Sequence, residues 1–371
     1  AGQHAQRCER NGENAVTTLK ECLLACLVLQ FSALAQAAPP AGSKPVRPKP
    51  VSETTVVPDA ERYSRRCQSQ AIHRIARPQG TMLWGTKRSW DTEKIADERS
   101  SVLVSVDLAS PRRAEAHVKA LRLEGARLVA VPSAGDVVGT VLQGTASDGK
   151  PVEVAICGAE PSPEDPSMVW YRIEAWNTVA QEWENPCVAL NRVPDPRALA
   201  VSGVWDASGA RQDVAGKLTF ACENGAITKC IHWGYKPWAS HAGQSLADLH
   251  QACTRMARAD YCGNGRSHTH EDTTIDMYDR LGMIERAAEI SADWDPAKGS
   301  FEAAWAPDGA TCLAHTRDGR ALESILQECP NRFSTGRMTD LGQEDRCVVQ
   351  RTDVSPDKAL LRNRSYGRGA K

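Results

Sequence analysis

The chain has 371 residues, of which 41% are hydrophobic and 25% are charged, so it is long enough for about two domains and too polar for a multi-span membrane protein. Lysine and arginine number 45, and aspartate and glutamate number 46. No excess of positive charge is therefore present to attract nucleic acid or an anionic membrane. Composition and charge predict a soluble globular protein without a nucleic-acid partner.

An apolar run near the N-terminus is typical of a secretory signal peptide. It covers residues 23–35 and ends in small residues at alternate positions. The run is short for a helix that crosses a bilayer, and Pro39-Pro40 follows it instead of a stop-transfer cluster. We therefore expect residues 1–38 to be an upstream extension plus a signal peptide that is cleaved near Ala35 or Ala38. The mature chain would be exported, to the periplasm or outside the cell, and would contain no transmembrane span.

Removal of this leader would leave ten of the 13 cysteines, an even number that allows all of them to pair. Disulfides form in the oxidising compartments to which exported proteins are delivered. We expect up to five disulfides, and a local pair such as Cys222 with Cys230 is one of hundreds of possible connectivities. The ten candidates are Cys67, Cys157, Cys187, Cys222, Cys230, Cys253, Cys262, Cys312, Cys329 and Cys347.

Residues 39–60 contain six prolines among small and basic residues and predict an extended linker that buries no core. A β-rich region is expected to follow over 61–195. Its strands are predicted where apolar residues alternate or cluster, at 102–106, 139–142, 152–156 and 168–176. Asp148-Gly149 predicts a hairpin turn before the third of these strands. In this region only 114–123 has a helical pattern.

Pro194-Asp195-Pro196 interrupts the strand pattern and predicts a domain boundary near residue 195. A second domain is expected over 196–350, and residues 351–371 form a basic segment that we interpret as a solvated tail. The expected fold class is α+β, with a β-rich N-terminal half and a disulfide-stapled α+β C-terminal domain.

Two helices are predicted in the second domain. The clearer one spans about 246–260, where apolar residues recur at steps of three and four and Ser245 is placed to cap the first turn. Cys253 lies on its apolar face and Cys262 follows its end, so these two cysteines are expected to staple the helix to neighbouring elements. The other helix is predicted at 321–328.

Several motifs of this second half belong together, at 222–230, 233–238, 249–262 and 275–279. They resemble the ADYC-domain family, whose namesake tetrapeptide stands here as Ala259-Asp260-Tyr261-Cys262. The resemblance is tight over 216–285 and extends over roughly 150–335, including Glu182-Trp-Glu-Asn-Pro-Cys187. It implies a bacterial, typically exported domain and transfers no catalytic residue.

The densest group of polar side chains follows the clearer helix, within twenty residues. It comprises Asp260, Cys262, His268, His270, Glu271, Asp272, Asp276 and Asp279. Imidazole and carboxylate groups bind zinc, and a catalytic zinc uses three such ligands and an open position. The metal-ligand candidates are His268, His270, Asp272 and Asp276, and the catalytic candidates are Asp260, His268 and Glu271.

The spacing of these residues matches no standard metal motif, and helix ends and turns use the same residue types for capping. Where the family pattern is expected to read His-Thr-Arg-Asp-Gly-Thr, this chain has residues 268–273 with His270 in third place. We therefore favour a structural loop and predict no cofactor, with a metal ion as the alternative. Cys262 beside a histidine would suit nucleophilic catalysis, but an exported cysteine with nine available partners is expected to be oxidised.

Two functions from different classes follow. The first is an exported, disulfide-stabilised binding or interaction module at the cell envelope or outside it, with a glycan or a protein as partner. Trp233, Tyr235 and Trp238 would suit stacking on a sugar ring, although we favour a role in the core. The alternative is an envelope hydrolase, metal-assisted in one version, with its site in 260–279. The sequence does not decide whether the protein is an enzyme.

Overall fold

The computed structural model describes residues 57–70, 72–74, 81–90, 98–109, 111–112, 118–132, 135–270, 273–287 and 294–366. These residues all belong to one compact unit, 55–371. Residues 1–54, with the predicted signal peptide and most of the predicted linker, lie outside the described residues. The end of that linker lies inside them, because helix α1 already begins at Asp59. The described part is β-rich with few helices.

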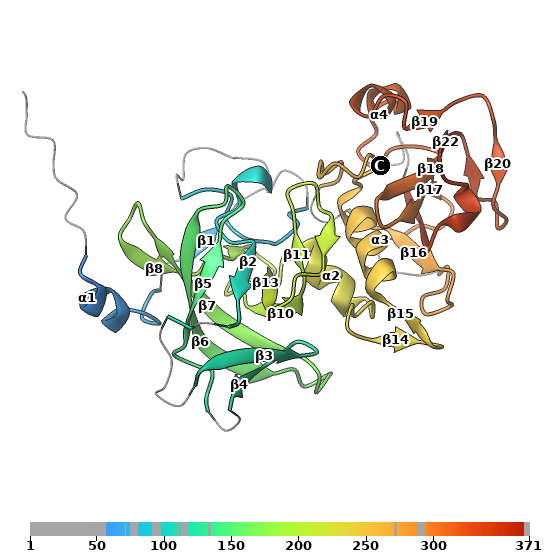
Figure 1. The fold of residues 1–371 in the computed structure, drawn as a ribbon. Helices are drawn as coiled ribbons and strands as arrows, with labels where there is room; N and C mark the ends of the chain where they lie inside the picture. Colours follow the sequence, from blue (N-terminus) through green and yellow to red (C-terminus); the bar gives the residue numbers. More distant parts are fainter. Residues whose placement is uncertain are drawn as a thin grey trace, which may run out of the picture. The chain divides into compact units, whose positions relative to one another are not determined.

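Six strands close into a barrel in the first part of the described chain (Figure 1). In order around the barrel they are β10 (Ala198–Ser202), β13 (Lys217–Cys222), β2 (Ser105–Asp107), β5 (Val141–Thr145), β6 (Pro151–Pro161) and β7 (Val169–Asn177). All neighbours are antiparallel, and pairing of β10 with β7 closes the ring. Strand β8 (Glu182–Glu184) extends the sheet beyond β7. The barrel takes strands from both sides of residue 195, where a boundary was expected.

Alternate residues of each barrel strand point inward, and most of these residues are apolar. Val154 and Ile156 of β6 pack with Leu142 of β5 in the largest core cluster of the barrel. Ala155, between them, belongs to another cluster with Trp176 and Trp183. The hairpin predicted at Asp148-Gly149 is confirmed, since it joins β5 to β6.

The helix predicted at 114–123 is wrong where the structure describes it. Residues Ala120–Glu124 form β3, which pairs with β4 (Arg127–Val131) around a turn at Gly125. Leu121 and Leu123 are two residues apart, so a strand places both on one face. The backbone at Gly125 has a φ of +62°, which glycine adopts without strain and which turns the chain back on itself.

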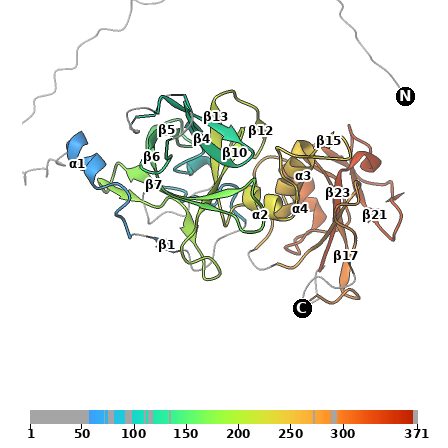
Figure 2. The same ribbon diagram turned by 90° about the horizontal axis from the view of Figure 1, so that it is seen from below.

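A six-stranded sheet, here called the C-terminal sheet, follows (Figure 2). Its strands, in spatial order, are β16 (Asp276–Asp279), β23 (Leu361–Tyr366), β17 (Gly299–Ala306), β18 (Gly309–Leu313), β22 (Val349–Arg351) and β19 (Phe333–Ser334). The interpretation of 351–371 as a tail is therefore corrected up to residue 366, because β23 lies between β16 and β17. Its arginines Arg362 and Arg364 look like tail residues in the sequence, but they are paired with buried carboxylates.

Short two-stranded pairings complete the β structure. They are β1 (His73–Arg74) with β9 (Val188–Ala189), β11 (Val204–Trp205) with β12 (Arg211–Gln212), β14 (Ser240–His241) with β15 (Gln244–Ser245), and β20 (Thr339–Asp340) with β21 (Arg346–Cys347). The helices are α1 (Asp59–Ser64), α2 (Ala226–His232), α3 (Ala247–Arg258) and α4 (Leu322–Glu328), with 3-10 turns η1 (Glu98–Ser100) and η2 (Pro356–Lys358).

Both helices predicted in the second half are confirmed, as α3 and α4. The Ser245 hydroxyl accepts a hydrogen bond from the Ala247 amide at 3.2 Å, at the first turn of α3. Leu249, Cys253 and Met256 lie in the core between α3 and the C-terminal sheet. Among the described residues, no helix is long and apolar enough to cross a membrane.

The ten cysteines expected to pair form five disulfides. The pairs are Cys67–Cys157, Cys187–Cys222, Cys230–Cys253, Cys262–Cys329 and Cys312–Cys347. Cys253 links α3 to α2, and Cys262 links the end of α3 to the end of α4, as stapling of this helix required. The local pair Cys222 with Cys230 does not form, because each of the two has another partner. None of the ten is a free thiol, so a Cys262 nucleophile is not available in this state.

Candidate functional site

A pocket of about 290 Å³ opens at β16 and β23 of the C-terminal sheet. Its walls come from the end of β16, the turn after it, residues 341–343, η2 and β23. The lining residues are Tyr278, Asp279, Arg280, Leu341, Gln343, Asp357, Ala359, Leu360, Leu361 and Arg362. Tyr278 and Asp279 end the 275–279 motif that the sequence singled out. The sequence analysis did not predict the other eight as site residues; Asp357, Ala359, Leu360, Leu361 and Arg362 come from the segment interpreted as a tail.

Asp279 shapes one wall of the pocket. Its carboxylate accepts hydrogen bonds from the amides of Leu281 and Ile284, both at 2.8 Å, and so fixes the turn that follows β16. The Tyr235 hydroxyl also donates to it at 2.9 Å. Burial, and then the negative charge of Asp279, raise the pKa of Tyr235, which therefore stays a hydroxyl donor. These bonds give Asp279 a structural role.

A second wall is fixed by a buried carboxylate behind it. Asp345 is fully buried, and it accepts hydrogen bonds from the Tyr278 hydroxyl at 2.8 Å and from Arg362 Nη1 at 3.2 Å. Arg362 Nη1 also donates to the Leu341 carbonyl at 2.9 Å, which ties two lining segments together. Burial raises the pKa of Asp345 and, with the help of that carboxylate, of Tyr278. Hydrogen bonds within the protein therefore fix this wall before any ligand binds.

The mouth of the pocket carries a cation without a partner. Arg280 is exposed, and among the described residues no acceptor lies within hydrogen-bond or ion-pair distance of its guanidinium. Asp357 is exposed too, and a hydrogen bond from Ser355 is the main cause of its lowered pKa, with the charge of Arg280 as a minor one. Leu341, Leu360 and Leu361 supply the apolar lining. The pocket thus suits a small molecule with an anionic group and an apolar part.

The catalytic candidate Asp260 is engaged in structural contacts. It is fully buried and forms an ion pair with Arg255 at 2.6 Å. Its two oxygens also accept hydrogen bonds from the amides of Asn264, at 3.1 Å, and Gly265, at 3.0 Å. The carboxylate therefore closes the turn after α3.

The other catalytic and metal candidates do not converge in the part of the chain that the structure describes. His268 is buried, with Nδ1 at 3.0 Å from the Ala259 carbonyl and Nε2 at 2.9 Å from Glu328. Hydrogen bonds from His268 and Asn264 outweigh burial and lower the pKa of Glu328. Asp276 accepts a hydrogen bond from Arg364 at 2.8 Å. His270 is exposed, and Glu271 and Asp272 lie outside the described residues.

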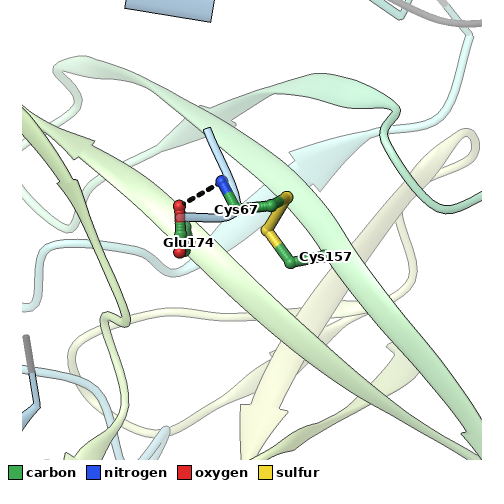
Figure 3. Close-up of side chains that lie close together, drawn as sticks. All are labelled: Cys67, Cys157 and Glu174. Atoms are coloured by element: carbon green, nitrogen blue, oxygen red, sulfur yellow. Dashed lines mark hydrogen bonds between the residues drawn. A yellow bond between two sulfur atoms is a disulfide. The ribbon is translucent and has the colours of Figure 1, made fainter. Parts of the chain in front are cut away.

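One group of three potential metal ligands occurs among the described residues, and it lies elsewhere. Cys67, Cys157 and Glu174 have their ligand atoms within 4.8 Å of one another (Figure 3). The two cysteines share a disulfide, so they offer no thiolate to a metal in this state.

The Ala259–Cys262 tetrapeptide forms a structural corner. Ala259 adopts the left-handed conformation, with φ of +50°, and ends α3. Asp260 closes the turn, as described above, and Cys262 forms the disulfide to Cys329. Tyr261 points inward and donates a hydrogen bond to Glu302 at 3.0 Å. The motif therefore joins α3 to the C-terminal sheet and to α4.

Glu302 is the centre of a buried polar network. Arg317 binds it through Nε at 3.0 Å and Nη2 at 2.9 Å, and Asn363 donates to it at 2.8 Å. Arg317 Nη2 also donates to the Met256 carbonyl at 2.8 Å, at the C-terminal end of α3. The charge and hydrogen bonds of Arg317 overcome burial and lower the pKa of Glu302. All these groups are satisfied within the protein, so the network holds the fold.

The aromatic cluster considered for sugar stacking belongs to the core. Tyr235 is fully buried, as described above. Trp233 packs against the core under the C-terminal sheet, and Trp238 packs against the core that contains Leu199 and Trp205. These three rings therefore do not form an exposed platform.

The protein is β-rich and stabilised by disulfides, with a closed barrel and a C-terminal sheet. The pocket at β16 and β23 is polar, and hydrogen bonds within the protein hold its walls. The family model of the ADYC domain matches residues 134–319, which is half of the chain, and the chain belongs to this family. The match begins just before β5 and ends after β18, so it includes most of the barrel and part of the C-terminal sheet. No curated protein and no solved structure matches the chain.

Proposed function

We propose that the protein is an exported, disulfide-stabilised binding module of bacterial type, and that its ligand occupies the pocket at β16 and β23. The described residues from 226 onward would form an α+β domain in this view, with α2, α3 and α4 beside the C-terminal sheet. The partner that the pocket suits is a small molecule with a carboxylate or similar anionic group. A larger glycan or protein at the envelope would present such a group as part of its surface.

The observation that carries the proposal is the contrast between Arg280 and the rest of the pocket. Asp279, Tyr278 and Arg362 are held by protein partners, whereas the guanidinium of Arg280 has none among the described residues. A guanidinium binds a carboxylate through two parallel hydrogen bonds, and the apolar lining next to it excludes water from the pair. A binding role also fits the absence of a free thiol among the described cysteines.

The hydrolase alternative has no comparable support. Its candidates Asp260 and His268 use their side chains for Arg255, for backbone groups of the turn, and for Glu328. No observation favours a second function, and we propose only the binding role.

Isothermal titration calorimetry with acetate, butyrate, succinate and inorganic phosphate tests the pocket. At least one of these anions should bind the wild-type protein, and Arg280→Gln should weaken that binding about 10-fold or more, since a charged hydrogen bond contributes about 1.5–3 kcal/mol. Arg346→Gln is the matched control, because Arg346 is an exposed arginine outside the pocket. Equal binding by the two variants, or no binding of any probe, would contradict the proposal.

The intact mass of the protein recovered from the medium or periplasm of an expressing bacterium tests export. The mass should correspond to a chain that begins after Ala35 or Ala38, and the ten cysteines should resist alkylation until a reductant is added. A retained leader, or ten thiols that react without reduction, would show that the protein is not exported in this way.

A further inference from the structure

The disulfide between Cys67 and Cys157 differs from the other four in its exposure. Cys67 is exposed and Cys157 is half-buried, whereas each of the other four disulfides has at least one buried cysteine. It joins residues 57–70, here called the arm, to β6 of the barrel. Thiol–disulfide exchange requires access of the attacking thiolate to sulfur. A reductant therefore reaches this disulfide more readily than the other four.

Glu174 of β7 lies beside this disulfide, as Figure 3 shows. One carboxylate oxygen accepts a hydrogen bond from the Cys67 amide at 2.6 Å, and the other accepts one from the Ser69 amide at 3.0 Å. Both amides belong to the arm, so the same carboxylate that faces the sulfur atoms also orients the arm. Each oxygen retains a second lone pair after these bonds.

The buried carboxylate forms no ion pair with a described residue, and the charge of Arg172 offsets its burial only in part. Glu174 is 3% exposed, and among the described residues no basic side chain lies within 4.0 Å of it. A buried carboxylate without an ion-pair partner is unfavourable, because burial removes hydration that amide donors replace only in part. A bound cation would supply the missing charge.

The three ligand atoms already have the composition of a zinc site. Two cysteine sulfurs and one carboxylate oxygen lie within 4.8 Å of one another, and the cysteine Cα atoms are 5.1 Å apart. Zinc binds thiolate at about 2.3 Å and carboxylate at about 2.0–2.2 Å, so small side-chain rotations would place all three on one ion. The exposed side of Cys67 leaves a fourth position for water.

We propose that Cys67, Cys157 and Glu174 form a redox-gated Zn²⁺ site, which binds the ion only when a dithiol reductant has opened the Cys67–Cys157 disulfide. Zinc then replaces the disulfide as the link between the arm and the barrel. This proposal does not depend on the pocket at β16 and β23.

The chemistry balances with a dithiol as the named co-reactant. Two electrons pass from the dithiol to the protein disulfide: the S–S bond of the protein breaks, an S–S bond forms within the reductant, and two protein thiols result. Binding of Zn²⁺ then forms two metal–sulfur bonds and one metal–oxygen bond, and releases the two thiol protons to solvent. The disulfide form of the same reductant can reverse these steps: it accepts two electrons and two protons to become the dithiol, the protein S–S bond forms again, and the ion is released.

Limited reduction followed by metal titration tests the site. The folded protein is treated with dithiothreitol until mass spectrometry shows two alkylatable cysteines, assigned to Cys67 and Cys157 by peptide mapping, and the reductant is removed without oxygen. Co²⁺ is then added as a spectroscopic probe for Zn²⁺. The reduced protein should bind one equivalent with a thiolate-to-cobalt charge-transfer band that Zn²⁺ abolishes, and the oxidised protein should show no band.

Glu174→Gln should weaken Co²⁺ binding at least 10-fold. Loss of a side chain that only hydrogen-bonds to a metal ligand already lowers metal affinity about 10–100-fold, and Glu174 would be a ligand itself. Glu182→Gln is the matched control, since Glu182 is an exposed acid on the neighbouring strand β8. The proposal is overturned if the singly reduced protein gives no band, or if the two variants behave alike. It is also overturned if limited reduction abolishes the near-ultraviolet circular dichroism and Co²⁺ does not restore it.

Discussion

The barrel and the C-terminal sheet bury different kinds of side chain. The main core of the barrel consists of apolar residues such as Leu142, Val154 and Ile156. In the C-terminal part, the buried side chains include ion pairs, with Glu302–Arg317 at 2.9 Å and Asp276–Arg364 as two examples. Within the described chain, the arginine–carboxylate pairs with both partners buried all lie between residues 255 and 364. On the barrel side, the described residues include one buried lysine pair, Lys87–Glu184, with a longer distance of 3.5 Å.

The two regions should therefore be sensitive to different kinds of substitution. An apolar core loses stability roughly in proportion to the volume removed from it, and it tolerates exchange of one apolar residue for another. A buried ion pair gives little net stability as a pair, but removal of one partner leaves an uncompensated buried charge. The C-terminal sheet should therefore respond sharply to single changes of charge, and the barrel should respond to changes of volume.

The largest effect is expected for Arg317→Met. The substitution leaves the carboxylate of Glu302 buried without its cation and removes a donor from the Met256 carbonyl. We expect a loss of about 3–5 kcal/mol in the free energy of unfolding, measured by urea denaturation. Arg172→Met is the control in the barrel, because Arg172 and its partner Asp195 are 44% and 51% exposed. That change should cost about 0–1 kcal/mol. Similar losses of unfolding free energy for the two variants would contradict the expectation that the buried ion pair is the more sensitive one.

An intermediate effect is expected from His250 of α3, and it depends on pH. Burial lowers the pKa of His250 to about 4, although its hydrogen bond with the Ile227 carbonyl opposes the shift. The folded state therefore holds the neutral ring, while the unfolded chain takes up a proton below about pH 6.5. Stability from this group is present above that pH and is lost as the pH falls toward 4, by about 3 kcal/mol in total.

Unfolding free energies at several pH values, for the wild-type protein and for His250→Gln, measure this effect. The difference between the two should be constant above pH 7 and should change by about 3 kcal/mol between pH 7 and pH 4, with the wild type losing more. Parallel curves would show that His250 does not stay neutral in the folded state.

The smallest effect compares two buried tyrosines, one in each region. The Tyr261 hydroxyl donates to the charged Glu302 and accepts from the Arg317 amide at 2.8 Å, whereas the Tyr171 hydroxyl of the barrel accepts from the Leu128 amide at 2.7 Å. Tyr261→Phe should cost about 2 kcal/mol and Tyr171→Phe about 1 kcal/mol, because bonds to charged groups are the stronger ones. Thermal unfolding ranks the two, and a larger loss for Tyr171→Phe would reverse the comparison.

Local patterns in the sequence predicted local structure well. The repeat of Leu249, Cys253 and Met256 defines α3, and Asp148-Gly149 defines a hairpin, because both depend on residues close in the chain. The even count of cysteines likewise predicted the number of disulfides. Their pairing, such as Cys67 with Cys157 at a separation of 90 residues, depends on the folded barrel and could not be predicted.

The wrong predictions concern residues whose environment is set by partners far away in the sequence. Arg362 and Arg364 are typical of a solvated tail, but Asp345 and Asp276 neutralise them inside the sheet. The sequence did not predict the pocket. Tyr278 and Asp279 lie in the 275–279 motif, but Arg280 could not be identified, because the lack of a partner for its guanidinium depends on the fold. The acids and histidines of 260–276 were predicted as site candidates because their side-chain types suit catalysis and metal binding. In the structure, Asp260 and His268 instead form hydrogen bonds and an ion pair that stabilise the turn after α3.

The position of β23 has a consequence for the order in which the protein is made. The barrel strands through residue 222 precede β23 in the chain, so the barrel can close first in a chain that emerges N-terminus first into the compartment where it folds. The C-terminal sheet cannot, because β16 and β17 wait for Leu361–Tyr366 to come between them. Until then both strands present unpaired edges, which are sites of aggregation. A chain that ends before residue 361 would thus carry a complete barrel and an incomplete sheet with unpaired strand edges.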